Sequence, residues 1–206
     1  MSKIDHKKKM KREALLDTAF ELFTKQGIHK TSISDIVQRA GVAKGTFYLY
    51  FKDKYDIHNR LIAGKAASIF REATADLERH PEITSVEDKI IFVTNYVIDL
   101  FEKDRSLLTF ISKNLSWAIF KNVLINSREE TDIDFHEVFI RLFDDSDIVY
   151  QNPEVLIFMI IEFVSATVYS SILYEEPLPM PEFRPYLNTA IRQIMKGQES
   201  GSSSQE

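Results

Sequence analysis

Hydroxyl, phenol and ammonium side chains gather between positions 32 and 50, with one glycine among them. They are Ser32, Lys44, Gly45, Thr46, Tyr48 and Tyr50. A lysine beside a threonine and two tyrosines suits contacts with phosphate oxygens and with the edges of bases. These residue types at this spacing therefore predict recognition of a nucleic acid.

A short helix and a tight turn must position the first of these side chains. Ser32 can cap a helix near 33–40, and Asp35 three residues later completes a capping box. Gly41 then permits the left-handed backbone that a tight turn needs, and Val42 can fill the angle between two helices.

A second short helix, near 44–51, must carry the remaining donors. Phe47 and Phe51 stand at i and i+4, so both can enter a core and leave the polar residues facing outward. The pattern predicts a helix-turn-helix whose second helix meets the major groove of DNA. On spacing alone, an ordinary corner between two helices remains the alternative.

The rest of the chain also predicts helices, so the expected fold class is all-α with about nine helices. A three-helix bundle is expected over 1–53, a larger helical domain over 54–197, and a polar, disordered tail over 198–206. Apolar spacing, caps and breakers predict helices over 8–26, 54–79, 86–103, 105–125, 131–144, 153–174 and 182–196.

Charge is distributed unevenly between these two domains. The net charge is −5, but residues 1–60 hold 13 Lys/Arg against 7 Asp/Glu, whereas residues 61–206 hold 13 against 24. This asymmetry indicates a basic module on an acidic body. Lysines 7, 8, 9 and 11 could add phosphate contacts, or they could only keep a frayed terminus solvated.

Residues 12–57 resemble the DNA-binding domain of the TetR family of bacterial regulators. The matching pieces are Ala-Phe-Glu-Leu-Phe at 19–23, Gly27, Thr31-Ser32, Asp35-Ile36, Ala40-Gly41-Val42, Lys44-Gly45-Thr46-Phe47-Tyr48, Tyr50-Phe51-Lys52-Asp53-Lys54 and Ile57. The resemblance implies phosphate contacts for Thr31, Tyr48 and Lys54. It places Lys44, Gly45, Thr46 and Tyr50 on the groove side, although the family often has histidine where Tyr50 stands.

The same resemblance implies a dimeric transcriptional regulator, usually a repressor that a small-molecule ligand releases from a palindromic operator on double-stranded DNA. An architectural or partner-binding DNA protein without ligand control is the alternative. In the family the last two helices pair with their copies, which implies a homodimer through 155–174 and 182–195. Segment 155–174 is apolar, with Glu162 as its only charged residue, and it is long enough to span a membrane. Its small hydroxyl residues and its central glutamate favour a buried or interface helix instead.

Aromatic residues between 92 and 139 could line an effector cavity or simply fill a core. The residues expected at such a cavity are Phe92, Tyr96, Asp99, Phe110, Trp117, Phe120, Phe139 and Glu162. Asp99 and Glu162 lie inside apolar runs, where an ionised carboxylate is costly without a partner. If either faces the cavity, a cationic or hydrogen-bond-donating ligand is favoured; pairing with Arg or Lys is the alternative.

Several other classes of function find no support in the sequence. There is no cysteine, the five histidines are scattered, and no phosphate-cradling glycine motif or nucleophile elbow is present. The expected protein is therefore not an enzyme and holds no cofactor or metal. No signal-peptide pattern follows the N-terminal lysines, which predicts a cytoplasmic location.

Overall fold

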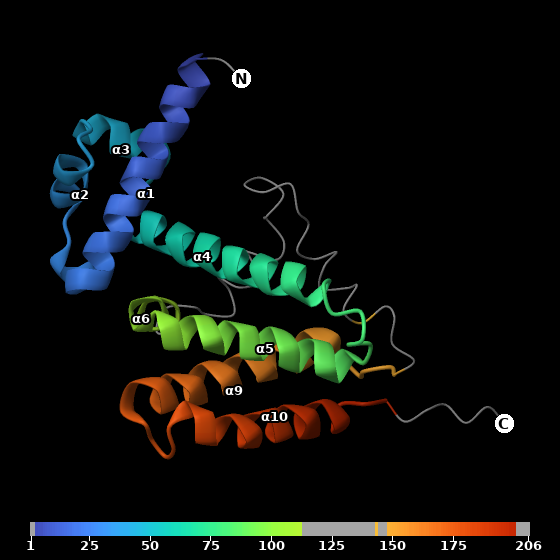
Figure 1. The fold of residues 1–206 in the computed structure, drawn as a ribbon. Coiled ribbons are helices and arrows are strands. Elements are labelled where there is room, and N and C mark those ends of the chain that lie inside the picture. The colour runs from blue at the N-terminus through green and yellow to red at the C-terminus, as the bar shows by residue number, and fades with distance from the viewer. Residues whose placement is uncertain (1–2, 113–142, 144–147, 201–206) are drawn as a thin grey trace.

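The computed structural model describes residues 3–112, 143 and 148–200, and within these ranges the chain forms eight helices and no strand (Figure 1). The helices are α1 (Lys3–Lys30), α2 (Ile33–Arg39), α3 (Lys44–Tyr50), α4 (Lys54–Leu77), α5 (Val86–Lys103), α6 (Arg105–Ser112), α9 (Pro153–Tyr174) and α10 (Met180–Lys196). The all-α prediction is confirmed. The predicted helices over 105–125 and 131–144 lie largely outside the described residues, apart from α6.

The N-terminal unit packs α2 and α3 against α1 (Figure 1). Its core comprises Leu15, Ala19, Leu22, Phe23, Ile36, Phe47 and Phe51, all less than a tenth exposed. Gly27 interrupts α1 with φ 81° and ψ 158°, which confirms the stop predicted there, and the chain then makes one more helical turn. The start of α1 lies five residues earlier than predicted, because nothing in the lysine-rich segment breaks a helix.

Local capping signals fix the ends of the long helices. Asp53 Oδ1 accepts hydrogen bonds from the backbone N–H groups of Tyr55 and Asp56 at 2.8 and 2.9 Å, so α4 starts at the next residue. Ser85 caps α5 and Asn152 caps α9, with Pro153 in the first turn of α9. Each such cap contributes about 1 kcal/mol.

The body is built from α4, α5, α6, α9 and α10, with α4 running from the N-terminal unit along the body (Figure 1). The predicted domain boundary at residue 53 therefore coincides with the N-cap of a helix that packs on both α1 and α5. Residues 198–200, predicted as part of a disordered tail, instead hydrogen-bond to the backbone of 149–151. Gln151 N–H donates to Gln198 O at 2.9 Å and Ser200 N–H donates to Val149 O at 2.7 Å.

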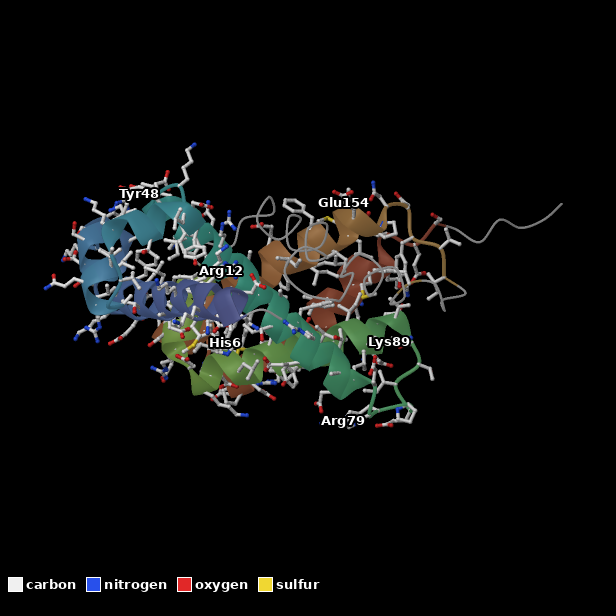
Figure 2. All side chains as sticks on the ribbon, turned by 90° about the horizontal axis from the view of Figure 1, so that it is seen from above. His6, Arg12, Tyr48, Arg79, Lys89 and Glu154 are labelled. Atoms are coloured by element: carbon white, nitrogen blue, oxygen red, sulfur yellow. The ribbon has the colours of Figure 1, made fainter. Side chains whose placement is uncertain are left out.

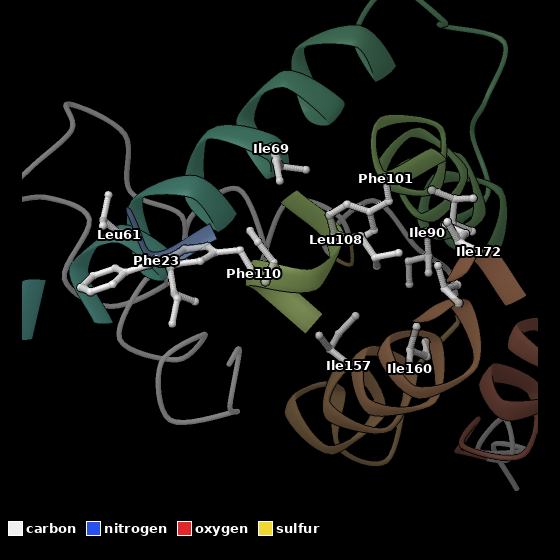
Figure 3. Packing of buried hydrophobic residues seen from close by; sticks show 14 of the residues in the cluster. Phe23, Leu61, Ile69, Ile90, Phe101, Leu108, Phe110, Ile157, Ile160 and Ile172 are labelled. Carbon is white, nitrogen blue, oxygen red and sulfur yellow. The ribbon is translucent and has the colours of Figure 1, made fainter. Parts of the chain in front are cut away.

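Helix α9 is long and apolar enough, by length and composition, to cross a membrane. In the structure one of its faces joins the core of the body through Leu156, Ile157, Ile160, Val168 and Ile172. Figure 3 shows Ile157 and Ile160 directed toward the side where α6 carries Leu108. Part of α9 thus serves as a core helix, as expected of a buried or interface helix.

An aromatic joint connects the body to the N-terminal unit. The ring of Phe110 on α6 lies edge-on to Phe20 on α1 and to His58 on α4, with centroid distances of 5.0 and 5.3 Å. His58 in turn lies 5.3 Å from Phe23. Burial lowers the pKa of His58, so the ring is held neutral among the aromatic side chains.

Candidate nucleic-acid interface

The turn between α1 and α2 is closed by a complete capping box. Asp35 N–H donates to Ser32 Oγ at 3.1 Å, and Ser32 N–H donates to Asp35 Oδ2 at 2.8 Å. Ser32 Oγ also donates to Asp35 Oδ2 at 2.7 Å, and this bond, together with that from Ser32 N–H, lowers the pKa of the Asp35 carboxyl group. The predicted box is confirmed, and it keeps Ser32 exposed at the start of α2.

The turn between α2 and α3 orients the second helix. Gly41 has φ 67°, and a Cβ placed on it would meet no atom within 4 Å, so the positive φ rather than crowding favours glycine here. Val42 N–H donates to Val37 O at 3.0 Å, which closes the corner. Phe47 and Phe51 are 0% and 1% exposed, so both anchor α3 in the core as predicted.

With those two phenylalanines buried, the opposite face of α3 is presented to solvent. Lys44 and Gly45 are exposed, Thr46 is half-buried, and Tyr48 is 54% exposed. Figure 2 shows Tyr48 at the outer side of the N-terminal helices, away from the body helices that carry Lys89 and Glu154. The exposed face has the size and chemistry to contact a DNA groove.

Leu49 belongs to the same face, and the sequence analysis missed it. Its side chain is 79% exposed, the highest value among the exposed large hydrophobic residues of the described part. An apolar residue is ordinarily assigned to the core, but the spacing of Leu49 from Phe47 and Phe51 could have placed it on the outer face of the helix. Leu49 is two residues from both Phe47 and Phe51, so about 200° of helical rotation separates it from either anchor.

Thr31 and Lys54 have internal partners. Thr31 is 1% exposed, and its hydroxyl donates to Gly27 O at 2.9 Å and accepts from Gln26 Nε2 at 3.2 Å. Lys54 Nζ donates to Ile28 O at 2.8 Å, Thr31 O at 3.1 Å and His29 O at 3.4 Å. An ammonium group has three donors, and all three point at carbonyls at the end of α1. The Thr31 side chain therefore stabilises the end of α1, and the Lys54 side chain joins α4 to it.

Tyr50 connects α3 to the N-terminal turns of α1. It is half-buried, and its hydroxyl donates to Lys8 O at 3.1 Å. This contact fixes the direction of the α1 extension, on which the lysines 7, 8, 9 and 11 are all exposed. The predicted set thus divides in two: Ser32, Lys44, Gly45, Thr46 and Tyr48 lie at the outer surface, whereas Thr31, Tyr50 and Lys54 make internal hydrogen bonds.

The body contains an apolar cavity of about 160 Å³ between α4, α5, α6 and α9. None of the five described residues predicted to line an effector cavity lines this one. Phe92 packs 5.1 Å from His80, Phe110 sits in the aromatic joint, and Tyr96 is half-buried elsewhere on α5. Trp117, Phe120 and Phe139 lie outside the described residues.

The two carboxylates, Asp99 and Glu162, also lie away from this cavity, and Asp99 has the arginine partner that was the alternative expectation. Asp99 is exposed and lies 2.6 Å from Arg184 Nη2 on α10, which also contacts Glu102 at 2.7 Å. Glu162 is exposed on the face of α9 opposite the core. Both residues have apolar neighbours in sequence, but successive side chains point to different sides of a helix, so these two carboxylates face away from the buried side. Among the described residues, no cluster of His, Asp or Glu could hold a metal ion.

One face of α9 and α10 exposes apolar side chains to solvent, with Glu162 among them on α9. On α9 it includes Val155 and Phe158, 44% and 38% exposed, with Ala166 further along the helix; on α10 it includes Tyr186, 66% exposed. The two helices pack against each other. Together they correspond to the predicted pairing segments 155–174 and 182–195.

Comparison with known proteins agrees with this architecture. Residues 15–61 match the family model described as bacterial regulatory proteins, tetR family. The chain is 32% identical over 100 residues to the fatty acid metabolism regulator protein of Bacillus subtilis, which is 48% of this chain and 50% of that protein. It is 26% identical over 133 residues to the HTH-type transcriptional repressor BepR of Brucella suis, covering 64% and 63% of the two chains. The chain spans about half the length of the first of these relatives.

Solved structures extend the likeness over nearly the whole fold. A TetR-family regulator from Syntrophomonas wolfei superposes with a TM-score of 0.64 at 20% identity, covering 92% of this chain and 96% of that one. The regulator FadR from Bacillus subtilis, in complex with stearoyl-CoA, superposes with a TM-score of 0.59 at 20% identity, covering 90% and 98%. These likenesses establish the fold of the chain, and residues 15–61 match the family model of the bacterial regulatory proteins of the tetR family.

Proposed function

We propose that this chain is a transcriptional regulator that binds duplex DNA through the outward face of α3 and the exposed start of α2. The observation that carries the proposal is the orientation of α3. Phe47 and Phe51 lock one side of the helix into the core, and Lys44, Tyr48 and Leu49 project from the other side. A helix held in this way can enter the major groove without further rearrangement.

The side chains on and around α3 have different roles in this proposal. Lys44 and Tyr48 bind phosphates or base edges, Gly45 allows close approach of the backbone, and Ser32 and Thr46 add hydroxyl contacts. Thr31, Tyr50 and Lys54 act as positioning residues, since their polar atoms bind other parts of the N-terminal unit. The lysines on the first turns of α1 supply further phosphate contacts.

A homodimer formed through the exposed apolar residues of α9 and α10 is part of the proposal. Val155, Phe158 and Tyr186 expose apolar surface that a second copy would cover, and an isologous two-fold contact needs only one self-complementary face. A two-fold axis would present two α3 helices to half-sites about 34–36 Å apart, which corresponds to a palindromic operator.

Repression relieved by a ligand completes the proposal. The cavity is walled partly by α4, which also packs on α1, so a molecule in the cavity can bias the position of the N-terminal unit. The TetR-fold relative that was solved with stearoyl-CoA shows that a related fold takes a small molecule. Release from DNA requires that the ligand binds the two dimer states with different affinity. Such a repressor would act on chromosomal DNA in the bacterial cytoplasm and would not be an enzyme.

Selection of bound sequences from a random duplex pool tests the DNA-binding proposal. The full chain should enrich an inverted repeat, and Lys44→Ala and Tyr48→Ala should each weaken binding to the enriched duplex by about ten-fold or more, as expected for losing a specific contact. Lys103→Ala, an equal charge change at an exposed position at the end of α5, is the control and should bind normally. Normal binding by both α3 variants would refute the assigned interface.

A further inference from the structure

We infer that the cavity of the body takes an uncharged ligand, or the uncharged end of a larger one, made mainly of hydrocarbon and carrying at most one hydroxyl or carbonyl group. This inference rests on the proposed ligand control. It names the chemical class of the ligand, and it replaces the expectation of a cationic ligand, which Asp99 or Glu162 would have favoured if it faced the cavity.

The walls of the cavity carry no charge among the residues that the structure describes. Sixteen residues from four helices line it, and fourteen of them present only hydrocarbon, among them Ile69 on α4, Ile98 on α5 and Ile157 on α9. Figure 3 shows Ile69, Phe101, Ile157 and Ile160 around this part of the interior. An ion enclosed here would lose its hydration and find no opposite charge in return, which disfavours both cations and anions.

The two carboxylates that the sequence analysis expected at a cavity adjoin lining residues but do not line this cavity. Asp99 follows the lining residue Ile98, yet it is paired with Arg184 on α10. Glu162 follows the lining residue Ile161, yet it is exposed on the outer face of α9. Neither carboxylate is therefore in position to recognise a ligand in the cavity.

Two hydroxyl groups provide the only polar chemistry on the described walls: those of Thr94 on α5 and Ser165 on α9. Elsewhere in these helices a threonine typically donates its hydroxyl to the carbonyl four residues back, as Thr74 does to Phe70 at 3.0 Å and Thr167 does to Phe163 at 2.8 Å. No such bond holds the hydroxyls of Thr94 and Ser165 among the described residues. They are placed to bind one oxygen atom of a ligand.

The size of the cavity sets the scale of the test probes. Its volume of about 160 Å³ is close to that of engineered apolar cavities of about 150 Å³, which bind benzene. Four probes with the same ring and different heads are therefore suitable: toluene, benzyl alcohol, benzylammonium and benzoate. At neutral pH the last two are charged.

Isothermal titration of the full chain without DNA measures the affinity for each probe, and thermal unfolding provides a second readout. Benzyl alcohol and toluene should bind, with benzylammonium and benzoate weaker by about ten-fold or more because a charge is buried unpaired. Thr94→Val and Ser165→Ala should each weaken benzyl alcohol by about three- to ten-fold and leave toluene unchanged, since each removes one hydrogen bond. Thr167→Val is the matched control, because its hydroxyl is already bonded within α9.

Ala66→Leu adds bulk to the cavity wall and should abolish binding of all four probes, while its melting curve reports whether the fold is retained. Binding of benzylammonium or benzoate as tight as that of benzyl alcohol would overturn the inference. So would binding of benzyl alcohol that is unaffected by both Thr94→Val and Ser165→Ala. Since DNA is absent, these outcomes are independent of the proposed DNA binding, which the duplex selection tests separately.

Discussion

Replacing Lys54 and Lys44 in turn by methionine separates a lysine that positions the DNA-binding unit from a lysine that contacts DNA. Lys54 directs its three donors at carbonyls of Ile28, His29 and Thr31, whereas Lys44 is exposed on α3. Methionine retains the length of the side chain and removes its charge. The two variants therefore make equal changes in charge at sites only ten residues apart.

The expected effects differ in kind and size. Removing the charged hydrogen bonds of half-buried Lys54 should cost about 1–2 kcal/mol of unfolding free energy, less than for a fully buried group. For a chain of this size that corresponds to a fall in Tm of about 2–8 °C. Lys44→Met should leave Tm unchanged. It should instead reduce the slope of log affinity against log salt by about 0.9 per phosphate contact, or about 1.8 for a dimer that carries two copies.

The salt slope is measured by fluorescence anisotropy of the selected duplex at a series of salt concentrations. The Tm is measured by thermal unfolding followed by circular dichroism. Lys54→Met should weaken DNA binding without changing the salt slope, because Lys54 contacts no phosphate and so releases no counterion when the chain binds. A reduced slope with an unchanged Tm for Lys54→Met would refute the positioning role. An unchanged slope for Lys44→Met would refute the placement of α3 at the phosphates.

Three further predictions follow from other parts of the structure. Leu49→Ala should remove the contact between the exposed Leu49 side chain and thymine methyl groups. Single dT→dU replacements that weaken binding of the natural chain to the duplex should therefore have no effect on binding of the variant, as measured by anisotropy. Phe158→Arg on the exposed face of α9 should shift sedimentation from dimer toward monomer, and equal sedimentation of both proteins would contradict the proposed interface. Burial lowers the pKa of His58, so below about pH 6.5 the unfolded chain binds a proton that the folded chain does not. The unfolding free energy should therefore fall as the pH decreases from that value toward the pKa of His58 in the folded state. His58→Phe keeps an aromatic ring beside Phe23 and should flatten this dependence in denaturant titrations at several pH values.

The features that local sequence predicts were recovered well. The capping box at Ser32 and Asp35 and the caps at Asp53 and Ser85 depend on residues within a few positions of one another, so their residue types are sufficient. The same applies to Phe47 and Phe51, whose spacing alone places them on one side of α3.

Other features depend on partners that are distant in sequence. Lys54 binds carbonyls 23 to 26 residues away, and Arg184 pairs with Asp99 across 85 residues. Neither pairing has a signature in sequence, so the arginine partner of Asp99 could not be identified, and the phosphate contact expected for Lys54 came from the family resemblance alone. The lining of the cavity was missed for a similar reason: aliphatic side chains such as Ile69 and Ile157 resemble any core residue until four helices are assembled around an unfilled space.

Photocrosslinking from α3 tests the central claim most directly. A benzophenone side chain is placed at position 49, the most exposed apolar site of α3, or at position 103 at the end of α5 as the control, and each protein is irradiated on the selected duplex. The proposed interface predicts crosslinks from position 49 to both half-sites of the duplex and none from position 103. Absence of crosslinks from position 49, in a protein that still binds the duplex, would show that α3 does not contact DNA.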